Sequence, residues 1–311
     1  MRKTFGVLAA IGAGALVAWI AASRALSGET LVTNWPSAEF IKQFSDREEN
    51  ESATRVMATA ERLGGDLAAA RPALSDYIRF GKTPPPPILQ KHANTIRTLR
   101  AQIASNPPPV WPLRIDDILE PPVPPLMLHM RLFQLFGADA VAQHASGNNA
   151  TAWTDLHAAW ILARSLWDRP ETMSIATALA GSRMIAMIAA KLDPPSPPWW
   201  PDASRFDISP PLLHSIEYEA WATRIRAERY PAGEPDGSRI DDTLRGMVSP
   251  FIRPIRLAQA SVTVGRMREV AASVNKSDPC EPFAVAGMPE WSGFVRRFNR
   301  FRCLHSRLTS R

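Results

Sequence analysis

The chain has 311 residues and a mass of 34.3 kDa, and 45% hydrophobic residues supply enough apolar material for one large or two modest globular domains. Its 29 prolines cluster between apolar stretches without a Gly-X-Y repeat, which excludes a collagen-like chain and a wholly disordered one. The net charge of +6 lies at the two ends, with +3 in residues 1–24, +5 in residues 290–311 and −2 between them, so the body of the chain is close to neutral.

The amino terminus has the pattern of a membrane anchor. Residues 4–22 contain no charge and follow Arg2 and Lys3. As a helix this stretch would be about 28 Å long, close to the thickness of a bilayer's hydrocarbon core. We therefore expect residues 1–27 to be an uncleaved signal anchor in a bacterial inner membrane, which places residues 28–277 in the periplasm. A cleaved signal peptide and a buried core helix are the alternatives.

Residues 28–277 are predicted to be all-α. Strand signals are scarce, whereas stretches rich in Ala, Leu, Met and Arg carry apolar residues at helical spacing. In chain order, the predicted helices span residues 37–80 with breaks near 64–65 and 71–72, then 88–105, 126–146, 150–168, 171–192, 211–230, 240–247 and 255–274. Together they indicate an irregular bundle or array of antiparallel helical hairpins with proline-rich connectors.

Proline positions set several of these boundaries. Residues 107–125 contain eight prolines, which exclude a regular helix or a central strand and predict an extended connector laid against the helices. Pro250 and Pro254 are expected to separate the last two helices, because proline cannot donate the backbone hydrogen bond that a helix needs.

The central helices carry an unusual number of large apolar residues. One stripe of the helix predicted over residues 150–168 contains Trp153, Leu156, Trp160, Ala163 and Trp167. Residues 175–190 are nearly all apolar, but a stretch of 16 residues is short for a membrane span and Arg183 lies in its middle. Both features favour a buried core helix over a second membrane span.

Residues 147–171, GNNATAWTDLHAAWILARSLWDRPE, resemble a single helical hairpin of the tetratricopeptide kind. The small and apolar positions of that repeat are matched by Gly147, Ala152, Leu156 and Ala159. No second copy follows at the roughly 34-residue period of the repeat, which implies one hairpin and no array. More broadly, residues 50–225, with the core DL-x-A-A-x-x-L-A and the segments RPE and PPWW, resemble uncharacterised all-helical proteins exported by bacteria. The resemblance implies fold class and compartment and transfers no catalytic residue.

The carboxy-terminal segment, residues 278–311, is a basic tail that contains both cysteines. Cys280 and Cys303 are predicted to form a disulfide in an oxidising compartment, and two buried free thiols are the alternative. The tail also interleaves aromatic and basic residues as an interfacial helix does, at Phe294, Arg296, Arg297, Phe298, Arg300 and Phe301. Contact with anionic lipid or a protein partner is one interpretation, and a solvated terminus held by the disulfide is the other. Nucleic acid is not an expected partner.

Signatures of common enzyme classes are absent from the sequence. It contains no Gly-x-Gly-x-x-Gly, no phosphate-binding Gly-x-x-x-x-Gly-Lys-Ser/Thr, no Gly-x-Ser-x-Gly and no His-Glu-x-x-His. His157, His214 and Glu217 are the conceivable acid–base groups, and no catalytic residue is assigned. His214 and Glu217 could also share a metal on one helix face, although a solvated helix face is the simpler interpretation.

Soft ligands raise a second metal hypothesis. Copper(I) prefers sulfur and imidazole, and the candidate ligands are Met127, His129, Met130, Met173, Met184 and Met187. Methionines on apolar helices more commonly fill gaps in a core. The sequence therefore predicts no metal and no cofactor.

These features predict a single-pass, periplasm-facing helical protein that serves as an interaction or scaffold protein. The absence of enzyme signatures and the single repeat-like hairpin favour this function. An envelope enzyme, or a carrier of lipid or another small ligand with a pocket inside the helical domain, is the alternative.

Overall fold

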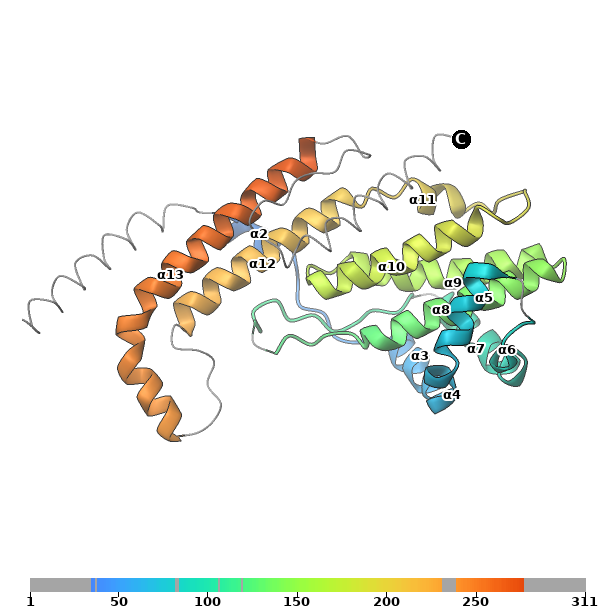
Figure 1. Ribbon diagram of the computed structural model, residues 1–311, viewed down its shortest axis with the longest axis horizontal. Helices are drawn as coiled ribbons and strands as arrows, with labels where there is room; N and C mark the ends of the chain where they lie inside the picture. Colours follow the sequence, from blue (N-terminus) through green and yellow to red (C-terminus); the bar gives the residue numbers. More distant parts are fainter. Residues whose placement is uncertain are drawn as a thin grey trace, which may run out of the picture. The chain divides into compact units, whose positions relative to one another are not determined.

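The computed structural model describes residues 35–36, 38–81, 84–105, 107–118, 120–230 and 239–276. These residues form twelve helices and no strand, so the predicted all-α fold is confirmed for the described part of the chain (Figure 1). The predicted anchor in residues 1–27 and the basic tail in residues 278–311 lie outside the described residues.

The helices fall into two groups, before and after the proline-rich connector. The first group comprises α2 (Ala38–Lys42), α3 (Glu51–Glu61), α4 (Gly64–Ala69), α5 (Arg71–Phe80), α6 (Pro87–Lys91) and α7 (Ala93–Ile103). The second comprises α8 (Leu126–Ala145), α9 (Asn149–Trp167), α10 (Thr172–Ala189), α11 (Trp200–Ser204), α12 (Ser209–Arg229) and α13 (Arg239–Lys276).

Most helix boundaries agree with the sequence prediction, and three regions differ. The region 37–80 is broken near residues 64 and 71 as predicted, but it also contains an extended segment between α2 and α3. The helix predicted over residues 88–105 is divided into α6 and α7, because His92 leaves the helical conformation. The His92 ring hydrogen-bonds the Asp66 carboxylate at 2.8 Å, which holds the division in place.

The two helices predicted over residues 240–247 and 255–274 are one helix, α13. The expectation that Pro250 and Pro254 separate them was therefore wrong. A proline inside a helix removes one hydrogen bond and costs about 3 kcal/mol, but it can be accommodated as a kink.

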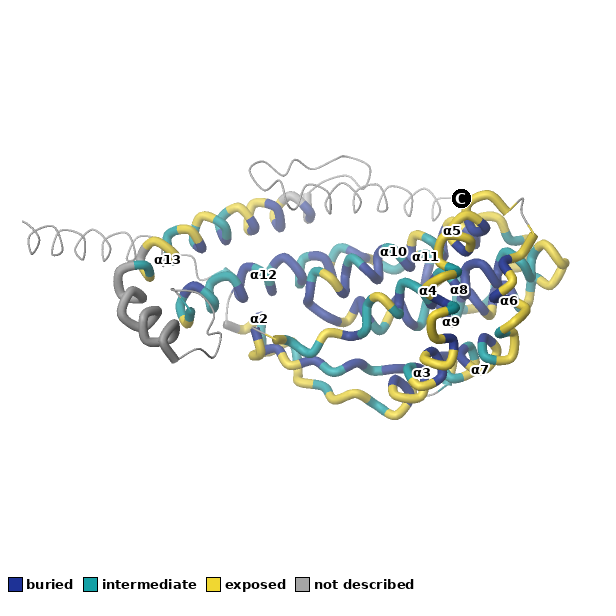
Figure 2. The backbone as a smooth tube through the Cα atoms, turned by 60° about the horizontal axis from the view of Figure 1, so that its bottom comes forward, coloured by how far each residue is buried: buried dark blue, intermediate teal, exposed yellow. Residues whose placement is uncertain are grey.

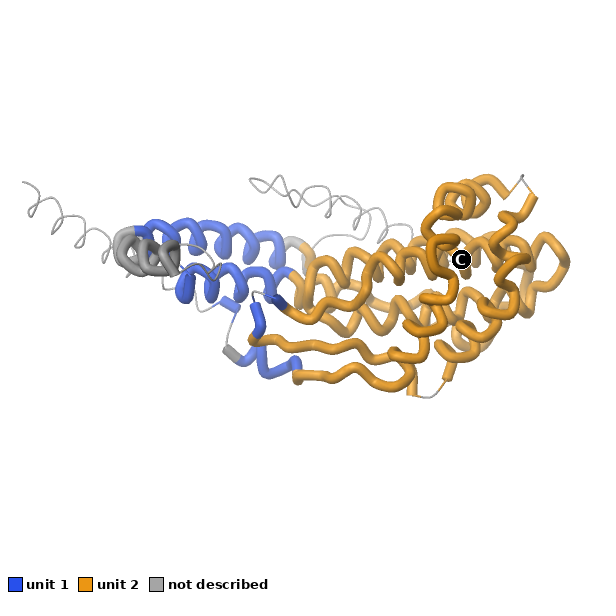
Figure 3. Tube along the Cα trace, turned by 90° about the horizontal axis from the view of Figure 1, so that it is seen from below, with its two compact units in different colours: residues 1–44, 117–120, 216–272 blue, residues 45–116, 121–215, 273–311 orange. Residues whose placement is uncertain are grey.

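The chain divides into two compact units (Figure 3). Unit 1 comprises residues 1–44, 117–120 and 216–272, and unit 2 comprises residues 45–116, 121–215 and 273–311. In unit 1, the buried residues of α13 recur at intervals of three and four, at Ala260, Val264, Met267, Val270 and Ala271. This spacing defines one apolar face along α13.

Helices α8, α9 and α10 pack against one another and form the core of unit 2, where long stretches of each are buried (Figure 2). Two glycines allow α8 and α10 to approach closely. A Cβ atom on Gly137 of α8 would lie 2.8 Å from Met184 Sδ, and one on Gly181 of α10 would lie 2.6 Å from the Phe133 ring. The small residues therefore accept large side chains from the facing helix, as ridges into grooves.

Helix α10 is long and apolar enough to cross a membrane by length and composition, and it is the one such helix found among the described residues. Within the structure, 61% of this stretch is buried. Its apolar side chains, including Ile175, Leu179 and Ile185, lie in the core of unit 2, and Arg183 is exposed. This placement agrees with the predicted buried core helix.

Candidate functional site

One face of α9 forms the floor of a cleft in unit 2. Its residues recur at intervals of three and four along the helix, at His157, Trp160, Ile161, Arg164 and Ser165, and Asp168 directly follows the helix. Other α9 side chains, such as Leu156, Leu162 and Leu166, are fully buried. The same helix therefore supplies core residues on one side and cleft residues on another.

Three further segments complete the cleft. Residues 108–111 of the proline-rich connector line one part, Trp199 and Asp202 line another, and Arg47 comes from the extended segment before α3. The cleft has a volume of about 370 Å³. Small-molecule sites in proteins measure about 300–1,000 Å³, so this cleft is of ligand-binding size.

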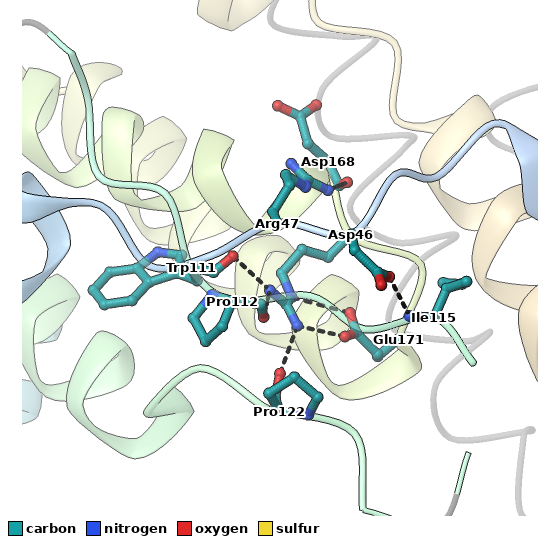
Figure 4. A network of polar contacts seen from close by, with 9 residues as sticks. Asp46, Arg47, Trp111, Pro112, Ile115, Pro122, Asp168 and Glu171 are labelled. Carbon is teal, nitrogen blue, oxygen red and sulfur yellow. Dashed lines mark hydrogen bonds and ion pairs between the residues drawn. The ribbon is translucent and has the colours of Figure 1, made fainter. Parts of the chain in front are cut away.

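The carbonyl groups of Trp111, Pro112 and Pro122 and the Glu171 carboxylate converge on one buried guanidinium, which holds the connector in place (Figure 4). Arg169 is 1% exposed, and its guanidinium donates to the carbonyl oxygens of Trp111 at 3.3 Å, Pro112 at 2.6 Å and Pro122 at 2.9 Å. It also forms a buried ion pair with Glu171. A proline-rich segment cannot pair its carbonyls as a helix does, so it needs donors from elsewhere. Arg169 supplies them and fixes the path of the connector.

The extended segment before α3 binds along the same connector. Arg47 and Leu113 exchange two backbone hydrogen bonds of 2.9 Å each. The Asn50 side chain donates to the Pro108 carbonyl at 2.9 Å and accepts from the Val110 amide at 3.0 Å. These bonds fix the backbone of Arg47 beside the connector wall of the cleft.

Aromatic rings form much of the cleft surface. The ring of His157 stacks on Trp199, with centroids 4.8 Å apart and planes inclined by 18°. Trp160 contacts Phe206 edge-on at 5.5 Å. Trp160 and Trp199 are both half-buried, so part of each indole stays accessible in the cleft that it lines. Such partly covered tryptophans are well suited to receive a flat ligand.

The charged groups of the cleft are unevenly paired. Arg164 forms an ion pair with the Asp168 carboxylate at 2.9 Å. Arg47 donates instead to the backbone carbonyl of Asp168, at 2.7 Å. Burial, followed by the charge of Arg169, lowers the pKa of Arg47, although Asp168 and Glu171 oppose this shift.

Burial also lowers the pKa of His157, so this ring is neutral at pH 7. His157 lines the cleft, which is where the acid–base group of an enzyme would lie. His214 and Glu217, the other predicted acid–base candidates, lie on α12 and do not line it. Burial lowers the pKa of His214 and raises the pKa of Glu217. Within the described ranges, no group of three or more His, Cys, Asp or Glu side chains is arranged to hold a metal ion.

Two of the proposed copper ligands, His129 and Met127, lie in different environments. His129 is 1% exposed, whereas Met127 is 56% exposed on the same helix. The His129 Nδ1–H donates to the Pro125 carbonyl at 3.1 Å, and burial lowers the pKa of this ring to about 4. Met184 packs against Gly137, which fits the interpretation of methionine as a filler of core gaps.

A second polar cluster is buried where α7, α8 and α9 meet. Arg100 pairs with Asp139 at 2.8 Å and with Asp155, whose Oδ1 accepts from Arg100 Nε at 2.6 Å. Burial, and then the neighbouring Asp139 carboxylate, raises the pKa of Asp155 to about 8, although Arg100 opposes the shift. None of the three residues lines the cleft. The cluster links three helices of unit 2.

The sequence singled out His157 and Trp160 but did not predict the other residues that build the cleft. Arg169 belongs to the RPE segment and Trp199 to the PPWW segment, and both were noted only as parts of a resemblance. The sequence indicates only that the connector's carbonyls need donors, and it does not identify Arg169, 47 to 58 residues away, as that donor. Cys280, Cys303 and the predicted contact residues of the tail lie outside the described residues.

Comparison with protein-family models, with curated proteins and with solved structures finds no match to this chain.

Proposed function

We propose that the protein binds a small organic ligand in this cleft and acts as a carrier or receptor for it. The observation that carries the proposal is the cleft itself, about 370 Å³ in volume and lined by the half-buried rings of Trp160 and Trp199 beside the Arg47 guanidinium. Binding sites for small molecules combine such apolar walls with a few placed polar groups. This is the ligand-carrier alternative that the sequence left open.

The hydrogen bonding inside the cleft supports binding over catalysis. The Ser165 hydroxyl donates to the Leu162 carbonyl at 2.8 Å and accepts from Trp111 Nε1 at 2.9 Å, so it is already engaged. His157 stacks on Trp199 and has no hydrogen-bond partner among the residues that the structure describes. A nucleophile requires an adjacent, oriented base, and these two side chains do not form such a pair.

Titration calorimetry with three probes of one ring size tests this function on the full-length protein in lipid nanodiscs. The probes are 2-naphthoate, 2-naphthamide and 2-naphthylmethylammonium. We expect at least one of them to bind. Trp160→Ala should weaken that binding about tenfold or more, because the substitution removes apolar surface from the cleft.

Phe80→Ala is the matched control, since Phe80 is an aromatic residue on α5 that is 55% exposed and does not line the cleft. This variant should bind the probe as the unmodified protein does. If none of the three probes binds, the proposed function is wrong.

We also infer that residues 4–22 anchor the protein in a bacterial inner membrane with the helical units in the periplasm. Support comes from the uncharged stretch after Arg2 and Lys3. Alkaline phosphatase fused after Arg311 should be active in this topology. A fusion that is expressed but inactive would overturn the orientation.

The scaffold function stays a prediction, as do the Cys280–Cys303 disulfide and the contact of the tail with lipid or protein. A cleft of about 370 Å³ accommodates a small molecule better than a folded partner, which favours the carrier function. Pull-down from gently solubilised membranes tests the scaffold directly, and recovery of the protein alone under several conditions counts against it.

A further inference from the structure

The cleft contains a positive charge, that of Arg47, which forms no ion pair with any carboxylate of the described residues. One N–H of the Arg47 guanidinium donates to the Asp168 carbonyl at 2.7 Å. The structure gives its remaining N–H groups no acceptor, and no carboxylate within ion-pair distance, among the described residues. The Asp168 carboxylate raises the pKa of Arg47 through its charge, but it pairs with Arg164. Arg47 therefore differs from the other two arginines that line the cleft, each of which has a carboxylate partner.

The position of Arg47 is set by the fold and not by chance on a mobile surface. Its backbone is paired with Leu113 on both sides, and its side chain is tethered to the carbonyl that follows α9. A guanidinium held in this way has lost part of its conformational freedom before any ligand arrives. Its planar fork matches the two oxygens of a carboxylate.

The electrostatic surroundings of Arg47 favour an added anion. Burial and the charge of Arg169 lower the pKa of Arg47 more than the Asp168 and Glu171 carboxylates raise it, so these two carboxylates do not fully compensate its charged form. Asp202 also lines the cleft, but it is exposed and water solvates its charge. The half-buried arginine gains more from a counter-ion than the exposed aspartate does.

The remainder of the cleft requires a flat apolar body. Trp160 and Trp199 line the same cavity as Arg47, and His157 is neutral and stacked. Ring ligands bury large apolar areas against such side chains. A ligand that satisfies both parts of the cleft carries one negative group attached to a planar ring.

We propose that the ligand is a planar ring carboxylate, whose carboxylate binds Arg47 and whose ring packs against Trp160 and Trp199. This inference rests on the proposed ligand-binding function. A single uncompensated arginine matches the single charge of a carboxylate, whereas a phosphate monoester carries nearly two charges at neutral pH.

The naphthalene probes separate this inference from the function on which it rests. On the full-length protein in nanodiscs, 2-naphthoate should bind about tenfold or more tightly than 2-naphthamide and 2-naphthylmethylammonium, because a hydrogen-bonded charge pair forms only with the carboxylate. If the amide or the amine binds as tightly as the carboxylate, the ligand class is wrong and the binding function stands. Tighter binding of 2-naphthyl phosphate than of 2-naphthoate would also overturn the carboxylate assignment.

The variant Arg47→Gln assigns the effect to one residue. It should weaken 2-naphthoate binding about tenfold or more and leave 2-naphthamide binding unchanged. Arg55→Gln is the matched control, because Arg55 is an exposed arginine of α3, paired with Glu51, that does not line the cleft. It should alter neither affinity.

If Arg47→Gln fails to fold, Arg47→Lys takes its place. The lysine keeps the charge but loses the bidentate fork, so 2-naphthoate affinity should fall about threefold or more. Unchanged 2-naphthoate affinity in a folded Arg47 variant would refute the role of this arginine.

Discussion

Replacing Arg169 with methionine tests whether one buried guanidinium holds the wall of the cleft. The Arg169 side chain is 1% exposed and the Glu171 side chain 8% exposed, so their ion pair is almost fully removed from water. Methionine approximates the length of arginine and leaves little cavity. The substitution leaves the Glu171 carboxylate without its partner and removes donors from three connector carbonyls, those of Trp111, Pro112 and Pro122.

The expected loss of stability follows from these contacts. Removing one partner of a buried ion pair costs about 3–5 kcal/mol, because the other charge stays buried and uncompensated. The bonds to Pro112 and Pro122 are part-buried, so water can replace some of what is lost. We therefore expect Arg169→Met to lower the free energy of unfolding of unit 2 by about 4 kcal/mol.

The matched double variant identifies the cause. Adding Glu171→Leu to Arg169→Met removes the orphaned charge and should recover about half of the loss, as replacement of a whole buried pair by apolar residues commonly does. Urea unfolding followed by circular dichroism measures the stability of both variants. A shift of the unfolding midpoint reports a change in stability when the dependence of the unfolding free energy on urea concentration is unchanged. Arg55→Met, which breaks an exposed pair with Glu51, should cost less than about 1 kcal/mol. A loss below about 1 kcal/mol for Arg169→Met, or a double variant less stable than the single one, would refute this reasoning.

Two further predictions concern the core: one tests its packing and the other the titration of a buried histidine. Gly181→Ala should destabilise unit 2 by about 1–3 kcal/mol in urea unfolding, because the added Cβ would lie 2.6 Å from the buried Phe133 ring. Gly265→Ala on α13 is the control. Its Cβ would meet nothing within 4 Å, so this substitution should be neutral or stabilising by up to about 1 kcal/mol. Equal effects of the two glycine substitutions would contradict the close contact of α8 and α10. Burial holds the pKa of His129 at about 4, below its ordinary value. The unfolded chain, in which this pKa is about 6.5, therefore binds more protons than the folded protein between these two pH values. The stability that neutral His129 contributes is lost as pH falls from about 6.5 to about 4. The measurement is the difference in unfolding free energy between the unmodified protein and the His129→Asn variant. This difference should fall by about 3 kcal/mol over this pH range. A constant difference would show that His129 titrates normally.

Local patterns predicted the helices well, because each depends on neighbouring residues. The spacing of apolar residues located α8, α9 and α10 within a few positions, and the tryptophan stripe of α9 is largely buried, with Trp153 and Trp167 in the core. Predictions of helix ends from single residues failed where contacts or the surrounding helix outweigh the preference of that residue. Pro250 and Pro254 do not end α13, and His92 divides a helix through a hydrogen bond to Asp66, a contact between helices that no local pattern contains.

The sequence by itself determined the helical class, the extended nature of the proline-rich connector and the apolar character of the central helices. Only the tertiary structure decided that Arg47, the connector, α9 and Trp199 line one cleft. The physical reason is that extended segments carry no periodicity from which their path can be inferred. Their carbonyls bond to whichever donor the fold brings near, and here that donor is Arg169, between 47 and 58 residues away along the chain. That Arg47 has no carboxylate partner among the described residues likewise follows only from the tertiary structure, in which Asp168 pairs with Arg164.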